Sequence, residues 1–176
     1  MEKNGRNLEH LHFNDTNDDD SNLDIVKFCP NLKSLRTIFR GDVEKLITIL
    51  NSCQQLESLE ICKDYEYFII ETKLLEVIVN HAPGKFHELK IRYESMDEVY
   101  DDKSFLEDLE SIFKNWANRI PRKSLSLIII DENGLDLTVV DETLEVIERF
   151  KKLNIIKKFE IIDDYKNKYS GHSGCH

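Results

Sequence analysis

The sequence predicts an α/β solenoid with short parallel strands on one side, helices on the other and a continuous core between them. Three observations support this fold class. A short apolar pattern recurs along the chain, a segment with helical apolar spacing precedes most copies, and those segments end at proline or polar turns. One such unit cannot bury its own helix face, so stacked units must share a core.

The expected strands are marked by a Leu-x-apolar core or a close variant. The first three copies follow one another at a spacing of 24 residues, and later copies are further apart. In four copies another apolar residue stands three positions earlier, at Leu8, Leu32, Leu56 and Phe86. The resulting L-x-x-L-x-L pattern is typical of leucine-rich repeats, so we expect a ribonuclease-inhibitor-like solenoid with a concave strand face and a convex helix face. The aligned copies are Leu11-His12-Phe13, Leu35-Arg36-Thr37, Leu59-Glu60-Ile61, Leu89-Lys90-Ile91, Leu125-Ser126-Leu127 and Phe159-Glu160-Ile161.

The expected helices carry apolar residues at steps of three and four, which places them on one face of a helix. Proline or polar turns at 29–31, 52–54, 82–84 and 120–121 should end the helices that precede them. The apolar sets are Val43, Leu46, Ile47, Leu50; Leu74, Leu75, Ile78, Val79; Phe105, Leu109, Ile112, Phe113, Trp116; and Leu144, Ile147, Phe150.

The chain is predicted to form one leucine-rich-repeat domain of five to six strand units over residues 1–163. The longer spacing of the later copies should leave loops at 63–68, 94–102 and 131–136, where charged residues and glycine suit exposed turns. Residues 164–176 lack a periodic apolar pattern and are expected to be a disordered tail.

Charge and hydropathy exclude several classes of function. The formal net charge is -10, which disfavours binding to nucleic acid or to an anionic membrane because both need a surplus of Lys and Arg. We find no apolar run of about 18 residues and no apolar signal-peptide segment, so we expect no membrane association and a cytoplasmic or nuclear location.

The chemistry-bearing residues predict no catalytic, cofactor or metal site. The acidic runs do not match a calcium loop, no glycine-rich phosphate loop is present, and no nucleophile elbow accompanies the histidines. The tail residues His172, Cys175 and His176 form no fixed geometry for a metal. Cys29 and Cys53 follow helical runs and are expected to be buried thiols. A small α/β enzyme is the alternative, resting only on the alternation of helices and strands.

The strand side chains between the inward anchors should face the concave groove, because successive side chains alternate across a strand. These positions are the candidates for binding an unidentified protein partner. They are Ser34, Arg36, Ser58, Glu60, Glu88, Lys90, Arg92, Ser126, Ile128, Lys158 and Glu160.

Four segments, CPNLKSL, SCQQLESLEI, APGKFHELKI and RIPRKSLSLIII, resemble the leucine-rich region of fungal F-box and leucine-rich-repeat proteins, over about residues 8–163. In that family an F-box helix bundle docks the adaptor of a cullin-type ubiquitin ligase while the repeats hold the substrate. Residues 1–7 leave no room for an F-box, so adaptor binding is not expected of this chain. The resemblance implies substrate recognition by the repeats.

The sequence is compatible with two functional hypotheses. One is a protein-binding module that selects substrates for a ubiquitin ligase. The other is a truncated structural or regulatory module that caps or competes with a longer relative. We expect a monomer, or a loose dimer paired through the first strand near residues 8–13, because exposed strand edges tend to pair.

Overall fold

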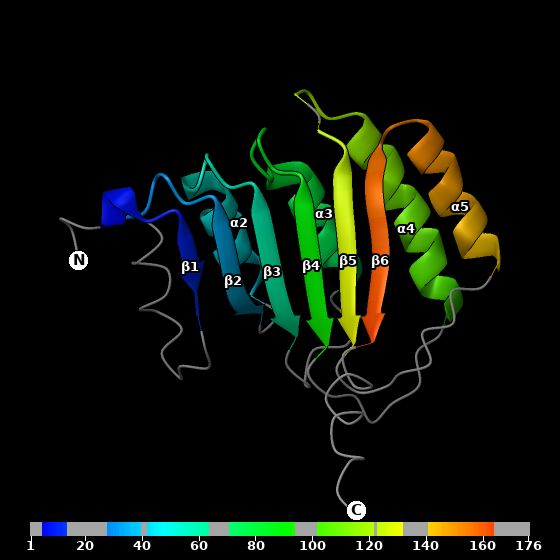
Figure 1. Cartoon of the computed structure of the whole chain (residues 1–176), viewed down its shortest axis with the longest axis horizontal. Coiled ribbons are helices and arrows are strands. Elements are labelled where there is room, and N and C mark those ends of the chain that lie inside the picture. The colour runs from blue at the N-terminus through cyan, green and yellow to red at the C-terminus, as the bar shows by residue number, and fades with distance from the viewer. Residues whose placement is uncertain are drawn as a thin grey trace, which may run out of the picture.

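The structure, a computed structural model, is an α/β protein with six parallel strands in one open sheet and helices between them. It describes residues 5–13, 28–39, 42–63, 71–93, 102–121, 123–131 and 141–163. Figure 1 shows the strands side by side in one layer, with the helices in a second layer behind and beyond them. The predicted loops at 63–68, 94–102 and 131–136 lie outside the described residues, except for one terminal residue of each loop. The predicted tail at 164–176 also lies outside them.

The elements alternate along the chain as predicted. After a short 3-10 helix, η1 (Gly5–Asn7), the strands follow one another in sequence order across the sheet. The strands are β1 (His10–His12), β2 (Ser34–Phe39), β3 (Ser58–Lys63), β4 (Glu88–Tyr93), β5 (Leu125–Asp131) and β6 (Ile156–Asp163), and the helices are α2 (Val43–Ser52), α3 (Glu71–His81), α4 (Asp102–Ala117) and α5 (Asp141–Lys152).

The strand register confirms the predicted alignment of the first four copies: Leu11, Leu35, Leu59 and Leu89 are successive partners. The predicted anchor of the fifth copy is wrong by two residues, because Leu89 pairs with Leu127 and not with Leu125. A shift of two keeps every side chain on its predicted face, because the side-chain period of a strand is two.

The same turn precedes the first four strands. In each copy the backbone N–H of the apolar residue three positions before the anchor donates to the carbonyl three residues further back. Leu32, Leu56 and Phe86 are buried, and Leu8 packs partly buried against the core. The turn therefore inserts one side chain into the core before each strand starts, as the L-x-x-L-x-L pattern predicts. The pairs are Leu8 to Gly5, Leu32 to Cys29, Leu56 to Cys53 and Phe86 to Pro83.

Neighbouring units are joined at the strand entrances by shared carbonyls. The Glu9 carbonyl accepts hydrogen bonds from the N–H groups of Lys33 and Ser34, and the Lys33 carbonyl accepts from those of Glu57 and Ser58. The Glu57 carbonyl continues the series in the next unit, where it accepts from two consecutive amides at 87 and 88. These bonds satisfy backbone donors at the strand entrances and fix the register between units.

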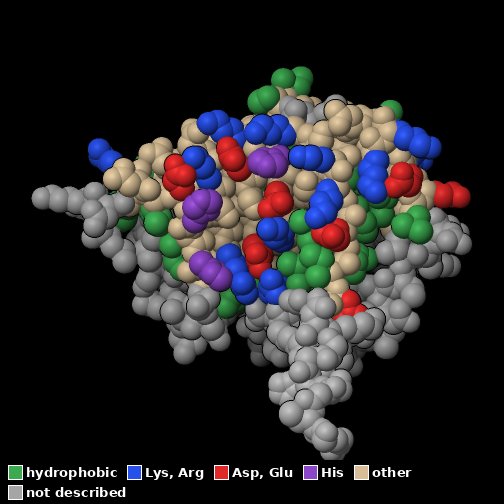
Figure 2. All heavy atoms as spheres, in the orientation of Figure 1, with side chains coloured by type: hydrophobic (Ala, Val, Ile, Leu, Met, Phe, Trp, Pro, Cys, Tyr) green, Lys and Arg blue, Asp and Glu red, His purple; other side chains and the backbone are tan. Residues whose placement is uncertain are grey.

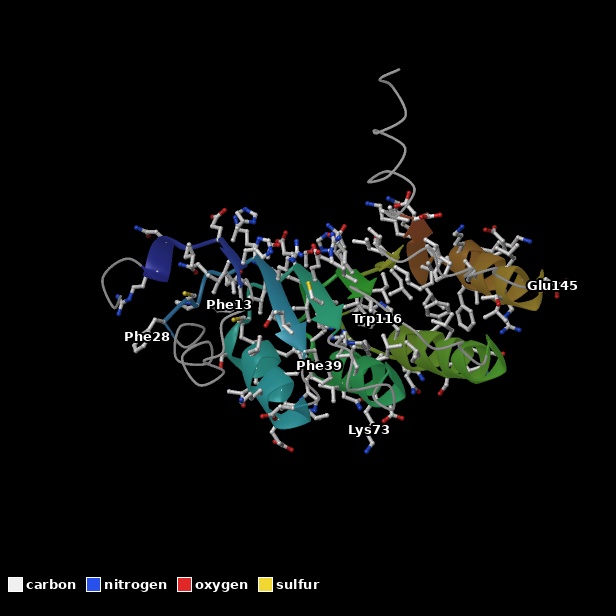
Figure 3. The ribbon with its side chains drawn as sticks, turned by 90° about the horizontal axis from the view of Figure 1, so that it is seen from below. Phe13, Phe28, Phe39, Lys73, Trp116 and Glu145 are labelled. Carbon is white, nitrogen blue, oxygen red and sulfur yellow. The ribbon has the colours of Figure 1, made fainter. Side chains whose placement is uncertain are left out.

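The core lies between the sheet and the helices. The inward anchors Leu35, Leu59 and Leu89 are buried, as are Phe113 and Trp116 of α4, which confirms their predicted core role. Figure 3 shows Trp116 between the sheet and the helix layer, whereas Lys73 of α3 points away on the far side of the helices. The Trp116 indole N–H donates to the Lys123 carbonyl at 2.9 Å, so its one polar group is satisfied.

The helices end where the sequence predicts. α2, α3 and α4 stop at Ser52, His81 and Ala117, shortly before Cys53, Pro83 and Pro121 respectively. α2 begins after Asp42, whose carboxylate accepts the Lys45 N–H at 3.0 Å as an N-cap.

The predicted packing face of α5 is wrong at one position. Leu144 is exposed, and Thr143 is buried beside Ile147 and Phe150 in its place. The buried set therefore follows steps of four and three from Thr143. No helix in the part of the chain that the structure describes is long and apolar enough to cross a membrane.

Candidate functional site

The candidate site is the outer face of the sheet, defined as the face opposite the helices. In a parallel register, alternate side chains of neighbouring strands line up into rows that cross the sheet. From β1 to β6 the first row is His10, Ser34, Ser58, Glu88, Ser126 and Lys158, the second is His12, Arg36, Glu60, Lys90, Ile128 and Glu160, and the third, from β2, is Ile38, Cys62, Arg92, Ile130 and Ile162.

These rows bring together every residue predicted to line the groove, from Ser34 on β2 to Glu160 on β6. They also contain residues that the sequence reasoning missed. Moving the predicted positions on β2 back by 24 residues would have identified the two histidines on β1. Extending the alternation of side chains by two residues along the other strands would have identified the rest. The missed residues are His10, His12, Ile38, Cys62, Ile130 and Ile162.

The centre of the outer face is an ion-pair cluster on β2, β3 and β4. Glu60 Oε1 lies 2.9 Å from Arg92 Nε and 3.5 Å from Arg36 Nε, so one carboxylate bridges two guanidinium groups. Arg36 Nε also donates to Cys62 Sγ at 3.3 Å. All these charged side chains are half-buried, so water screens their interactions less than it would at a fully exposed site.

A second polar cluster lies in the first and second rows beside it. The Ser58 hydroxyl donates to Glu88 Oε1 at 2.8 Å, and Lys90 Nζ lies 3.1 Å from the same oxygen. Burial alone would raise the pKa of Glu88, but the hydrogen bonds from Ser58 and Lys90, with the positive charge of Lys90, hold it below its ordinary value. Glu88 is therefore a carboxylate fixed in its ionised form on this face at neutral pH.

The outer face becomes apolar toward β5 and β6. Ile128 and Ile130 are only 5% and 6% exposed, and Ile162 is half-buried next to Ile130. Figure 2 shows acidic and basic side chains interleaved over β2 to β4, with a hydrophobic patch beside them. Ser126 is also buried, so Ser126 and Ile128 lie on the predicted face but offer little surface to a partner.

The described residues hold no group of three or more His, Cys, Asp or Glu side chains that could bind a metal ion. Cys29 and Cys53 are buried free thiols, as predicted. Burial, with a smaller contribution from Cys29, raises the pKa of Cys53 to about 11. A thiol with such a pKa stays protonated at neutral pH and is a poor nucleophile.

The comparisons with family models, with curated proteins and with solved structures found no match for the chain. The class that its own structure defines is an α/β protein with a single open parallel sheet and a polar-to-apolar outer face.

Proposed function

We propose that this chain is a leucine-rich-repeat solenoid that binds another protein on the outer face of its sheet. The repeat assignment is supported by the four identical turns, in each of which an apolar residue donates to a carbonyl three positions earlier. It is also supported by the strand order, in which each strand from β1 to β6 lies beside the next strand in the sequence. Both features are expected when one supersecondary unit is stacked repeatedly.

The observation that carries the binding proposal is the alignment of side chains into rows on the face opposite the helices that the structure describes. Six strands at a spacing of about 4.8 Å present a surface about 24 Å wide. That width suits a typical protein interface, which covers about 800 Å² on each partner.

The composition of this face favours a protein over a nucleic acid. Four cations (Arg36, Lys90, Arg92 and Lys158) are interleaved with three anions (Glu60, Glu88 and Glu160), and each cation lies within 4.0 Å of one of these anions. The cations thus exceed the anions by one, whereas a phosphate backbone would need a much larger surplus of cations.

Within this proposal, substrate selection for a cullin-type ubiquitin ligase is the favoured context. It rests on the resemblance of the four turn-and-strand segments to the repeats of fungal F-box proteins. A regulatory module that competes with a longer relative is the second candidate. It would use the same outer face, so the two candidates differ in what accompanies the chain in the cell.

The experiment that tests binding is affinity purification of the tagged chain from its own cells, compared between two triple variants. R36Q/K90Q/R92Q removes cations from the outer face, and K45Q/K73Q/K114Q removes one cation from each of α2, α3 and α4. We expect the first variant to lose a partner that the second retains. Equal recovery with both variants, each confirmed as folded by circular dichroism, would contradict binding on the outer face.

The cellular context is tested by probing the same purified material for the ligase adaptor and cullin. A partner recovered without either subunit, and displaced by a co-expressed longer relative, supports the regulatory candidate. A partner whose ubiquitination falls when this chain is deleted supports substrate selection.

A further inference from the structure

A polar hollow lies at the end of the helix layer where the strands enter the sheet. It is bounded by the C-terminal ends of α3 and α4 and by the turns that follow them, and in Figure 1 these helices end at the top, beside the starts of the strands. Its volume is about 630 Å³, within the range found for ligand pockets. We call it the helix-end hollow, and its polar lining includes Gln54, Asn80, His81, Asn115, Asn118 and Arg119.

The hollow contains a half-buried guanidinium group without an acidic partner. Arg119 Cζ lies 4.3 Å from the centre of the Trp116 ring, and Arg119 Nη2 donates to the Ala82 carbonyl. Loss of hydration lowers the pKa of Arg119, although a guanidinium group stays charged. No lining residue is acidic, and no carboxylate of the described residues lies within 4.0 Å of Arg119. A partly desolvated charge without a counter-charge is unfavourable, so this group is suited to receive an anion.

Arg149 on α5 shows how a similar group is paired elsewhere in the chain. Its Cζ lies 5.1 Å from the centre of the Phe150 ring, and its Nη2 lies 2.8 Å from Glu110 Oε1. Both arginines therefore lie over an aromatic ring, but of the two only Arg149 has a carboxylate partner in the described part of the chain. The formal net charge of -10 shows that acidic residues are abundant. The carboxylate that Arg119 lacks is the group that a ligand would supply.

Carboxamide side chains with unused hydrogen-bonding capacity surround this charge. Asn80, Asn115 and Asn118 are exposed, and their side chains form no hydrogen bond with any other residue that the structure describes. Gln54 donates to the Asn51 carbonyl at 2.9 Å and keeps its side-chain oxygen free. A carboxamide has donors and an acceptor that match the C=O and N–H of a peptide group. These side chains come from three neighbouring units, so they are spread out as an extended ligand requires.

We propose that the helix-end hollow binds the C-terminal end of a peptide or protein chain in extended form. The terminal carboxylate would accept from the remaining N–H groups of Arg119, whose planar fork matches a carboxylate. The last backbone amides would pair with the carboxamides of the three asparagines. Ile120, which is 96% exposed and lines the hollow, would contact an apolar side chain of the ligand. A terminal carboxylate lies directly in line with backbone amides, whereas methylene groups separate an Asp or Glu carboxylate from them.

The charge of the hollow favours a carboxylate over a phosphate group. Arg119 is the only Lys or Arg among the lining residues, and one cation matches the single charge of a carboxylate better than the nearly doubled charge of a phosphate. The ends of α3 and α4 also carry partial negative charge. Part of it is already compensated, because the carbonyls of Ile78, Asn115 and Trp116 accept backbone N–H groups. The remainder further disfavours a multiply charged anion.

The guanidinium group is held in place before a ligand binds. The Trp116 ring on which it lies packs edge-on against Phe86, with the ring centres 6.1 Å apart. The turns that follow α3 and α4 are also in contact, since a Cβ atom at Gly84 would lie only 2.7 Å from Pro121 Cγ. Because the site is already formed by these contacts, ligand binding loses less side-chain entropy.

The test is an NMR titration of the full chain with two pools of N-acetylated tetrapeptides of randomised, uncharged sequence. One pool has free C-terminal carboxylates and the other has C-terminal amides. The chain has one tryptophan, so the indole N–H beside Arg119 gives a single signal. We expect the carboxylate pool to shift this signal and that of Arg119 Nε–H with a Kd of about 1 mM or lower, and the amide pool to bind at least about tenfold more weakly. Equal binding of both pools, or no shift with up to about 5 mM of either, overturns the proposal.

Further probes identify the source of the carboxylate. Acetate and inorganic phosphate supply an anion without peptide amides, and amidated tetrapeptides that contain one Glu supply a carboxylate from a side chain. Each should bind at least about tenfold more weakly than the carboxylate pool. If acetate or phosphate bound as tightly as the pool, the hollow would be a simple anion site. If the amidated Glu peptides did so, it would recognise acidic side chains. Either result overturns the assignment to a chain terminus.

Variants locate the binding in the hollow. Arg119→Gln should weaken the carboxylate pool at least about tenfold, because it removes the charge that meets the carboxylate. Arg149→Gln, the matched control, removes the other stacked guanidinium group and should bind like the wild type. N80A/N118A removes two exposed carboxamides and should weaken the pool at least about threefold. It also decides the matter if circular dichroism shows Arg119→Gln to be unfolded. Unchanged binding in N80A/N118A, or in a folded Arg119→Gln, overturns the proposal.

The helix-end hollow shares no residue with the rows of the outer face, so this inference does not depend on the proposed function. The variant R36Q/K90Q/R92Q should bind the carboxylate pool with an unchanged Kd. A loss of binding in that variant would show that the peptides bind the outer face, and would overturn the hollow as their site.

Discussion

The two halves of the outer face are built on the same strand register but from different chemistry. Over β2 to β4 the second and third rows contain the cluster of Arg36, Glu60 and Arg92, whereas over β5 and β6 the same rows contain Ile128, Ile130 and Ile162. The backbone register is the same at these positions, so the two halves differ only in their side chains. A sheet of parallel strands in a constant register can thus change its surface chemistry from one edge to the other without changing its fold.

This contrast also separates two roles within one face. If the proposed function holds, the ion pairs between half-buried side chains would select a partner by charge, because a mismatched partner leaves a desolvated charge without compensation. A nearly buried apolar patch stabilises the sheet itself through the burial of hydrocarbon. We therefore expect substitutions in the apolar half to lower the free energy of unfolding most. Substitutions in the ionic half should lower it less and should instead weaken the binding of the proposed partner.

The largest expected effect is that of Ile128→Asp in the apolar half. It places a carboxylate where the native side chain is 5% exposed, which should lower the free energy of unfolding by about 3 kcal/mol or more. Ile128→Val, the matched control, should cost about 1 kcal/mol. Urea unfolding measures both values, and equal costs for the two variants would show that this half of the face is not a packed patch.

Glu60→Gln should have the next largest effect, because it removes the carboxylate that bridges Arg36 and Arg92. We expect a loss of about 1 to 2 kcal/mol in the free energy of unfolding, since two guanidinium groups then lie half-buried without that anion. Glu76→Gln on the exposed side of α3 is the control and should change stability by less than about 0.5 kcal/mol. A cost for Glu60→Gln no greater than that of the control would contradict a structural role for the cluster.

Ser58→Ala tests the second polar cluster through its pH dependence. Losing the hydroxyl bonded to Glu88 should cost about 1 kcal/mol at pH 7. Because the folded-state pKa of Glu88 is lowered, its contribution is present above the unfolded-state pKa and is lost as pH falls through the folded-state value. Ser58→Ala should raise that pKa toward its ordinary value, so the variant should lose less stability than the wild type between pH 7 and about pH 3. Identical losses in thermal melts at the two pH values would refute the assigned bond.

The smallest effect is expected for Lys158→Ala at the far end of the first row. Its ammonium lies 2.6 Å from Glu160 Oε2, but both side chains are largely exposed. Such a pair contributes less than about 0.5 kcal/mol to folding. If chemical denaturation instead gave a loss above about 1 kcal/mol, the apolar half would depend on this ion pair for its stability.

The sequence predicts the faces of the strands better than their register. Leu125, Leu127 and Ile129 all point inward, so the apolar pattern of β5 fits its neighbour equally well at shifts of two residues. The choice is made by long-range hydrogen bonding, in which the Ser126 N–H donates to the His87 carbonyl. Such a contact between separate units leaves no local signal in the sequence, whereas the turns before the strands do.

The sequence also predicts the existence of α5 but not which side of it is buried. The leucine at 144 and the threonine at 143 both fit a helical period with Ile147 and Phe150. Hydrophobicity alone selects the leucine, although the packing of α5 against its neighbours buries the threonine. Leu144 is therefore left exposed on the side of α5 that faces away from the core.

The strand order, which follows the sequence from β1 to β6, has a consequence for how the chain folds. Each strand is hydrogen-bonded only to strands of adjacent units, so the sheet closes no long loop and the entropy lost at each step stays small. Folding can start at any adjacent pair of strands and spread in both directions, one unit at a time. The end units then open more readily than the middle of the array, and amide protection should rise from both ends toward β3 and β4.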